Sequence, residues 1–158
     1  MQTSVLLSVK PEFADKIFAG LKRFEFRRVL FKATTVSRVV VYASTPIKKV
    51  VGEFEVEAIL SYAKRELWKL TSAYAGIEKE FFDEYFGDRP RAHAIKIKGV
   101  RKYPKPVALY RVCRSKRPPQ SFMYLSGRWS IDSHLGTMLM QRVTGAARRP
   151  RTGAPSRG

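Results

Sequence analysis

The pattern of hydrophobic and polar positions changes period near residue 20. Between residues 11 and 21, apolar residues follow the i, i+3 and i+4 spacing of an amphipathic helix, at Phe13, Ala14, Ile17, Phe18 and Leu21. Pro11 suits the first position of such a helix, and Gly20 suits the residue just after its end. The sequence therefore predicts a short helix over residues 11–19.

After Gly20 the hydrophobic period is two. Two phenylalanines alternate with charged residues in the run Arg23-Phe24-Glu25-Phe26-Arg27, and this pattern predicts a half-buried strand. One interpretation is that the charged face, with Lys22 at the junction, recognises a ligand. The other is a solvated sheet face whose charges pair with cross-strand neighbours, each pair adding about 0.2–1 kcal/mol. The spacing alone does not separate the two.

The same patterns predict the remaining elements. Strands are expected over residues 5–9, 38–43, 50–60 and 92–100, with a closing strand around Phe122 and Tyr124, and helices over residues 64–74 and 77–86. The apolar, β-branched run 38–43 is typical of a central strand covered on both faces. Gly52 indicates a bulge or a close backbone approach. The run Tyr103-Pro104-Lys105-Pro106 is expected to be a loop.

Three carboxylates share one face of the strand 50–60, at Glu53, Glu55 and Glu57. A divalent-metal site needs clustered oxygen ligands, but alternate strand residues lie about 7 Å apart. Pairing with the many lysines and arginines is therefore the favoured interpretation. His93, on an apolar strand face, is interpreted as a hydrogen-bonded core residue rather than as an acid–base group.

The helix predicted over residues 77–86 combines aromatic and acidic side chains. Its aromatic residues have the 3.6-residue spacing of packing, so they are interpreted as core rather than as a base-stacking platform. Its acidic residues are expected to lie away from any phosphate path.

Composition adds a strong positive charge. The 158 residues include 31 Lys and Arg against 13 Asp and Glu, a formal net charge of +18. Residues 1–125 alone hold 25 basic and 12 acidic residues, so the excess is not confined to the C-terminal part. Such an excess favours phosphate backbones as partners first and anionic membrane surfaces second. The length predicts one domain large enough to bury a core.

The C-terminal part has a different composition. Residues 126–158 hold six Arg and one Asp but neither Lys nor Glu, and from Thr144 onward no residue can supply a core. We expect a domain at residues 1–125 and an Arg-rich, largely disordered extension at 126–158.

Cys113 is the single cysteine, so neither a disulfide framework nor a cysteine-rich zinc site is expected. A lone thiol, with no signal-peptide pattern and no membrane-length apolar run, predicts a soluble cytoplasmic protein. No cofactor, metal site or oligomeric state is indicated.

Several short motifs occur in a characteristic order. The run Gly20-x-Lys22-x-x-Glu25-x-Arg27 follows the first helix, which is preceded by Leu7-Ser8-Val9-Lys10. Further matches are Tyr42-Ala43-Ser44-x-Pro46, Val51-Gly52-Glu53-Phe54, Gly76-Ile77 and Pro118-Pro119-Gln120-Ser121-Phe122. Together, over about residues 4–125, they resemble the ASCH family of the PUA-like superfamily.

This resemblance implies an α+β fold, a PUA-like mixed β-barrel with helices at its rim. It also implies a cleft beside the first helix, lined by Lys22, Glu25 and Arg27 and approached by Lys10, Gln120 and Ser121. Strict strand alternation places Lys22 on the face opposite Glu25 and Arg27. The turn after Gly20 must therefore redirect Lys22 if it belongs to the cleft.

Two functional classes follow, and both concern nucleotides. The first is a nucleic-acid or nucleotide-binding domain, with RNA as the expected partner, acting in RNA metabolism or its regulation. Arg27 offers a fork for phosphate or carbonyl oxygens, Glu25 accepts from base amines or amides, and Lys22 adds a point charge. A weaker alternative is an interaction module of transcriptional or translational complexes.

The second class is a hydrolase that uses Lys22 and Glu25 as catalytic groups, with lysine as the general base. Its substrate is either a modified nucleoside of the N4-acylcytidine type or RNA itself. Relatives of the resembled family are thought to deacylate such a nucleoside with a lysine, a threonine and a downstream glutamate. Here Glu25 stands in place of that threonine, and Tyr74-Ala75-Gly76 offers no downstream acid, so that assignment does not carry over.

Overall fold

The structure is a computed structural model that describes residues 2–126 and 129–135. The chain divides into two compact units, residues 1–126 and 127–158. In the second unit, the described residues 129–135 include a helical turn at residues 131–135. The rest of the extension for which disorder is expected lies outside the described residues.

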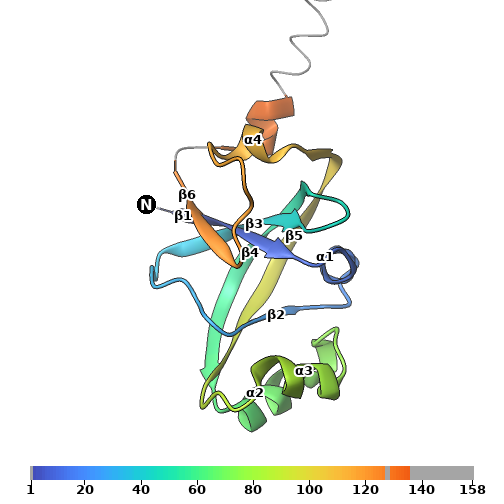
Figure 1. The fold of residues 1–158 in the computed structure, drawn as a ribbon, viewed down its shortest axis with the longest axis vertical. Coiled ribbons are helices and arrows are strands. Elements are labelled where there is room, and N and C mark those ends of the chain that lie inside the picture. Colours follow the sequence, from blue (N-terminus) through green and yellow to red (C-terminus); the bar gives the residue numbers. More distant parts are fainter. Residues whose placement is uncertain (1, 127–128, 136–158) are drawn as a thin grey trace, which may run out of the picture. The chain divides into compact units, whose positions relative to one another are not determined.

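A six-stranded mixed sheet forms the centre of the first unit (Figure 1). In chain order the elements are β1 (Thr3–Val9), α1 (Pro11–Phe18), β2 (Phe24–Arg27), β3 (Val36–Ala43), β4 (Lys49–Tyr62), α2 (Lys64–Thr71), the 3₁₀ turn η1 (Ser72–Tyr74), α3 (Lys79–Phe86), β5 (Ala92–Val107), α4 (Leu109–Val112) and β6 (Phe122–Leu125). The strand order is β2-β5-β4-β3-β1-β6, and only β1 and β3 pair in parallel.

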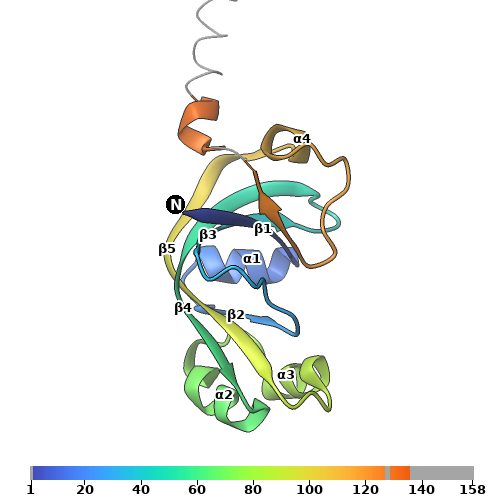
Figure 2. The ribbon, with the colours of Figure 1, turned by 90° about the vertical axis from the view of Figure 1, so that its left-hand side faces the viewer.

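The α+β class and the mixed sheet are confirmed, but a barrel is not. Among the described residues β2 and β6 are the two ends of the sheet and do not pair with each other. The sheet is bent by β4 and β5, which form a long twisted ribbon from the β1–β3 region to α2 and α3 (Figure 2). Among the described residues, no helix is long and apolar enough to cross a membrane.

The loop expected at residues 103–106 is wrong, because β5 continues to Val107. Tyr103 and Val107 are buried, whereas Pro104 and Pro106 lie on the exposed side of the strand. The β4–β5 ladder is also irregular here, with register shifts between Val50 and Gly52. Proline is tolerated at such irregular positions because a ladder hydrogen bond is already missing.

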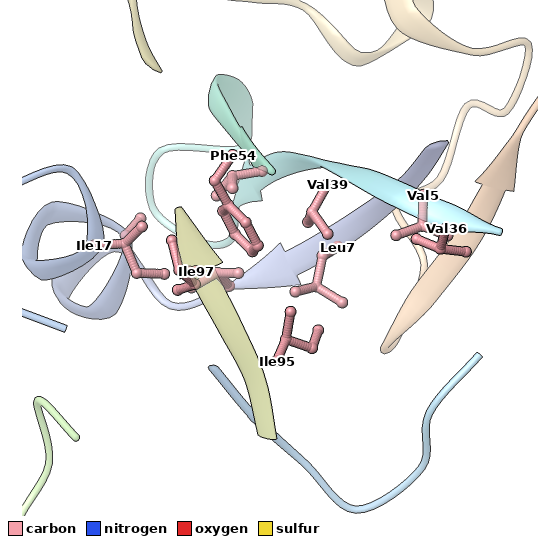
Figure 3. Packing of buried hydrophobic residues seen from close by; sticks show 11 residues of the cluster. Val5, Leu7, Ile17, Val36, Val39, Phe54, Ile95 and Ile97 are labelled. Atoms are coloured by element: carbon pink, nitrogen blue, oxygen red, sulfur yellow. The ribbon is translucent and has the colours of Figure 1, made fainter. Parts of the chain in front are cut away.

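Two hydrophobic clusters fill the unit. The first lies between α1 and the strands β1, β3, β4 and β5, and Figure 3 shows its side chains, with Leu7, Val39 and Phe54 near the centre and Ile17 on α1 at the left. The second joins Phe24 and Phe26 of β2 to α2, α3 and β5. Phe24 and Phe26 are therefore core residues. The expected half-burial of β2 is wrong, since all four of its residues are buried.

Gly52 occupies a position where the backbone of β4 is approached closely from two sides. It lies at the register shifts of both ladders that β4 makes, and a Cβ there would lie 2.6 Å from the carbonyl oxygen of Arg101 and overlap the Phe18 ring. The close approach expected from the sequence is confirmed.

Replacing Gly52→Ala is expected to lower the free energy of unfolding by about 1–3 kcal/mol, because the added methyl group overpacks a rigid site. Urea denaturation measures this change. The double variant Phe18→Leu/Gly52→Ala should recover only part of the loss, since the carbonyl contact remains. Full stability of Gly52→Ala would contradict the described packing.

Candidate functional site

A cavity of about 750 Å³ opens beside α1 and β2. Its walls come from the end of β1, from α1, β2 and α3, and from the segment before β6. All six side chains predicted to form the site line it: Lys10, Lys22, Glu25, Arg27, Gln120 and Ser121. Their common location is an observation, and their role in binding or catalysis stays a prediction.

The turn after α1 redirects Lys22, as the cleft requires. Gly20 adopts a φ of +77°, which L-residues with a side chain rarely adopt. The backbone N–H groups of Leu21 and Lys22 then donate to the carbonyl of Lys16, at 2.9 and 3.1 Å. Lys22 thus precedes β2, whose first residue is Phe24, and strand alternation does not apply to it. Its side chain joins those of Glu25 and Arg27 in lining the cavity.

Lys22 is almost completely buried, with 2% of its surface exposed. Its Nζ donates to the carbonyl oxygen of Ala75 at 2.7 Å and lies 4.8 Å from the centre of the Phe26 ring. Burial lowers the pKa of Lys22 from 10.5 to about 8, and it outweighs Glu25, which raises the pKa. Gly76 makes room for the stem, because a Cβ there would lie 2.6 Å from the Cβ of Lys22.

Glu25 and Arg27 form a buried ion pair on β2. Arg27 Nη2 donates to Glu25 Oε1 at 3.0 Å and to the carbonyl oxygen of Ser8 at 2.6 Å. Arg27 Nη1 makes only long contacts, of 3.5 and 3.4 Å, with the carbonyl and hydroxyl oxygens of Ser121. Within the described part of the chain, Glu25 Oε2 and Arg27 Nε are buried without a hydrogen-bond partner. These contacts cover the charged face of β2, so the solvated interpretation is wrong.

Comparison with known proteins identifies the family. The family model described as the ASCH domain matches residues 7–105. This chain belongs to the ASCH domain family.

Similar ASCH proteins are known from Zymomonas mobilis. An ASCH domain-containing ribonuclease is 29% identical over 123 residues, covering 76% of this chain and 82% of the relative. The crystal structure of ASCH from that organism has a TM-score of 0.71 at 28% identity and covers 85% of this chain and 94% of the other.

A further similar sequence is part of a longer protein. The large ribosomal subunit protein uL22 of Ureaplasma parvum is 34% identical over 128 residues, which cover 77% of this chain. The match spans 39% of the length of that relative.

The ASCH cavity has an aromatic wall that the sequence analysis missed. Phe81 and Tyr85 of α3 line it with nearly parallel rings, 6.4 Å between centres and 10° between planes, whereas Phe82 and Phe86 are core. The core interpretation is confirmed for Phe82 and Phe86, and Tyr85 packs against the same cluster while it also lines the cavity. Phe81 lines the cavity and contacts the Phe13 ring edge-on at 5.5 Å. Because neighbouring helix positions point in different directions, one helix can place aromatic rings both in the core and at the cavity.

The rim of the ASCH cavity carries cations. Lys10 Nζ lies 5.4 Å from the centre of the Phe81 ring, and the guanidinium of Arg28 lies 4.8 Å from that of Tyr85. Arg28 and Arg89 are exposed and line the same cavity, although neither was singled out from the sequence. The acidic residues of α3 are not part of this lining.

Two of the three carboxylates singled out on β4, and also His93, have structural partners. Glu53 pairs with Arg38 at 2.6 Å and Glu57 with Lys96 at 2.9 Å, as their interpretation required. In residues 2–126 and 129–135, no three His, Cys, Asp or Glu side chains form a group that could hold a metal ion. His93 is half-buried, and its Nδ1 lies 2.7 Å from Ser61 Oγ.

The buried lysine makes the stability of the ASCH domain depend on pH. Burying a charged lysine lowers the free energy of unfolding. Between pH 8 and 10.5 the unfolded chain keeps the Lys22 proton that the folded chain releases, so this loss of stability becomes smaller as the pH rises. Lys22→Met removes this loss. The difference in free energy of unfolding between Lys22→Met and wild type should therefore shift by about 1–3 kcal/mol in favour of wild type between pH 7 and pH 10.

Urea unfolding of both proteins at the two pH values measures this difference. Lys69→Met, which changes an exposed lysine, serves as the control and should show no such trend. If the stability difference between Lys22→Met and wild type is the same at both pH values, the pKa of Lys22 is not lowered.

Proposed function

We propose that this ASCH domain binds RNA and takes one unpaired nucleotide into the cavity. The observation that carries the proposal is the set of three buried charged side chains, Lys22, Glu25 and Arg27, which line one cavity with hydrogen-bonding capacity left over. Buried polar atoms in native proteins normally have partners, so unused ones at a cavity favour a polar ligand. The Zymomonas mobilis relative named a ribonuclease directs the proposal toward RNA.

The cavity suits a nucleotide in size and in lining. Its volume of about 750 Å³ lies within the range of small-molecule sites. The parallel rings of Phe81 and Tyr85 provide an apolar wall along which a base can lie, and single-stranded RNA is commonly recognised through such aromatic contacts. An unpaired base can enter without the unpairing energy that a duplex requires.

The cationic rim suits the phosphates on either side of that nucleotide. Lys10, Arg28 and Arg89 are exposed at the mouth of the cavity, and the chain as a whole has a net charge of +18. Neutralising phosphates with such side chains releases counterions and makes affinity depend steeply on salt.

A second candidate function is cleavage of the bound RNA, which is the hydrolase alternative on RNA. It is favoured by Lys22, whose pKa of about 8 makes it a usable general base near neutral pH. In the proposed step Lys22 takes the proton of a 2′-hydroxyl, whose oxygen attacks the adjacent phosphorus. The P–O5′ bond breaks, and the 5′-oxygen is protonated by water. Arg27 offsets the charge that develops on the phosphate oxygens.

The products of this step are a 2′,3′-cyclic phosphate and a 5′-hydroxyl end.

No observation favours the deacylation of a modified cytidine. Glu25 occupies the position of the threonine that such relatives use, and the Ala75 carbonyl accepts from Lys22 where those relatives have an acid. The interaction-module alternative has no specific support either.

RNA binding is expected to weaken steeply with salt, and Arg28→Ala should reduce the slope of log K against log[salt] by about 1, because one phosphate contact is lost. Fluorescence anisotropy with a labelled single-stranded RNA, from low to physiological salt, measures the slope. Lys69→Ala removes the same charge from an exposed site outside the cavity lining and is the matched control. A flat salt dependence, or equal effects of the two substitutions, would overturn the proposed binding mode.

If the domain cleaves RNA, the rate should rise with pH to a plateau above about pH 8, following the deprotonation of Lys22. Lys22→Arg keeps the positive charge but cannot act as a base, so it should lose at least about 100-fold in rate. Mass spectrometry of the products tests for cyclic phosphate ends. Undiminished cleavage by pure Lys22→Arg would reject this role.

A further inference from the structure

The three buried charged groups of the cavity present an ordered set of hydrogen-bonding atoms. Glu25 has 5% of its surface exposed, and its Oε1 already accepts from Arg27 Nη2 at 3.0 Å. Its Oε2 is buried and, among the described residues, has no hydrogen-bond partner. The carboxylate therefore offers a ligand one acceptor atom rather than two.

A donor is held on either side of this acceptor. Lys22 is anchored at the α2–α3 side, where its Nζ donates one N–H to the Ala75 carbonyl, so an ammonium group keeps two further N–H groups. Arg27 is anchored at the β1 side by the Ser8 carbonyl, and its Nη1 makes only long contacts with Ser121. Along the chain, Glu25 lies between Lys22, which precedes β2, and Arg27, which is two residues further along the strand.

The resulting order, donor–acceptor–donor, can be compared with the pairing edges of the four RNA bases. Uracil presents an acceptor, a donor and an acceptor at O4, N3–H and O2, so each of the three protein groups meets a partner of the opposite hydrogen-bonding type. Guanine presents two adjacent donors, which a carboxylate binds best with both oxygens, and Oε1 of Glu25 is occupied by Arg27. Cytosine and adenine offer an amine donor at the end of the edge with an acceptor beside it, so at least one buried cation stays unmatched.

We propose that the cavity selects uracil, with Glu25 Oε2 accepting from N3–H and with Lys22 and Arg27 donating to the two carbonyl oxygens. This inference rests on the proposed function and deepens it by naming the base. The wall formed by Phe81 and Tyr85 contributes little to the choice, because every base has an aromatic face. Selectivity comes from the edge, where an unmatched buried polar group carries the larger penalty.

A single-position substitution series tests the base preference. The full chain is titrated against labelled ten-nucleotide RNAs, identical except for one central nucleotide that carries uracil, cytosine, adenine, guanine or 3-methyluracil. A 2′-fluoro group on that nucleotide blocks cleavage through its 2′-hydroxyl. At physiological salt the uracil strand is expected to bind about 10–100-fold more tightly than the other four, since a well-matched base contact gives this discrimination.

3-Methyluracil is the decisive ligand, because it keeps both carbonyl oxygens and replaces only the N3 hydrogen with a methyl group. It should bind as weakly as cytosine. Glu25→Gln, which is nearly isosteric, should reduce the ratio of uracil to 3-methyluracil affinity at least about fivefold, as a neutral acceptor replaces a charged one. Thermal unfolding of the variant checks that it is folded, and Lys69→Ala should leave the ratio unchanged.

The outcomes separate this inference from the function on which it rests. Tight, salt-dependent binding of all five strands with equal affinity would overturn uracil selection while leaving RNA binding intact. Equal affinity for uracil and 3-methyluracil would do the same. Binding of none of the strands, or binding insensitive to Arg28→Ala, would reject the proposed function itself.

Discussion

The burial of three charged side chains beside one cavity is the constraint on which the rest of this domain depends. Removing an ammonium, a carboxylate and a guanidinium from water is expensive, and an ion pair inside a protein is often no better than an apolar replacement. The fold offsets the penalty locally, through the Ala75 carbonyl for Lys22 and through the Ser8 carbonyl for Arg27. Glu25 Oε2 and Arg27 Nε, two buried atoms of residues that line the cavity, receive no hydrogen-bond partner among the described residues.

The backbone around the site is shaped by this arrangement. Gly20 turns the chain so that Lys22 enters the cavity, and Gly76 leaves room for its stem, since any side chain there would overlap it. Both glycines act on the placement of the same lysine, although they come from distant parts of the sequence. The second apolar cluster, with Phe26 and Phe82 in edge-to-face contact at 5.2 Å, fixes β2 against α3 and thereby positions the charged face on the opposite side.

The sequence predicted those features that depend on residues close together in the chain, such as helix ends and short motifs. Pro11 and Gly20 delimit α1 within one residue of the expected end, and the GxKxxExR run contains the three buried charged residues that line the cavity. The burial of both faces of β2 was not predictable in this way. Its charged face is covered by Ser8 and Ser121, which are separated from Arg27 by 19 and 94 positions, and no pattern within a strand reports such contacts.

The same limit explains the division of α3 into a core face and a cavity face. Phe82 and Phe86 are buried in the core, whereas Tyr85, at the core's edge, and Phe81 also line the cavity; how deeply each ring is buried depends on where β2 lies. The open sheet is likewise a property of the whole fold, because closure depends on whether β2 and β6 meet.

The two roles proposed for Lys22 are compatible only because of its position. A protonated lysine can donate to a base carbonyl but cannot accept a proton, whereas a neutral amine has two N–H groups and one lone pair. With one N–H held by the Ala75 carbonyl at 2.7 Å, the neutral form still has one N–H for a ligand carbonyl and a lone pair for a hydroxyl proton. A pKa of about 8 places both forms in reach near neutral pH. The burial that lowers the stability of the fold is thus the same feature that makes the group chemically useful.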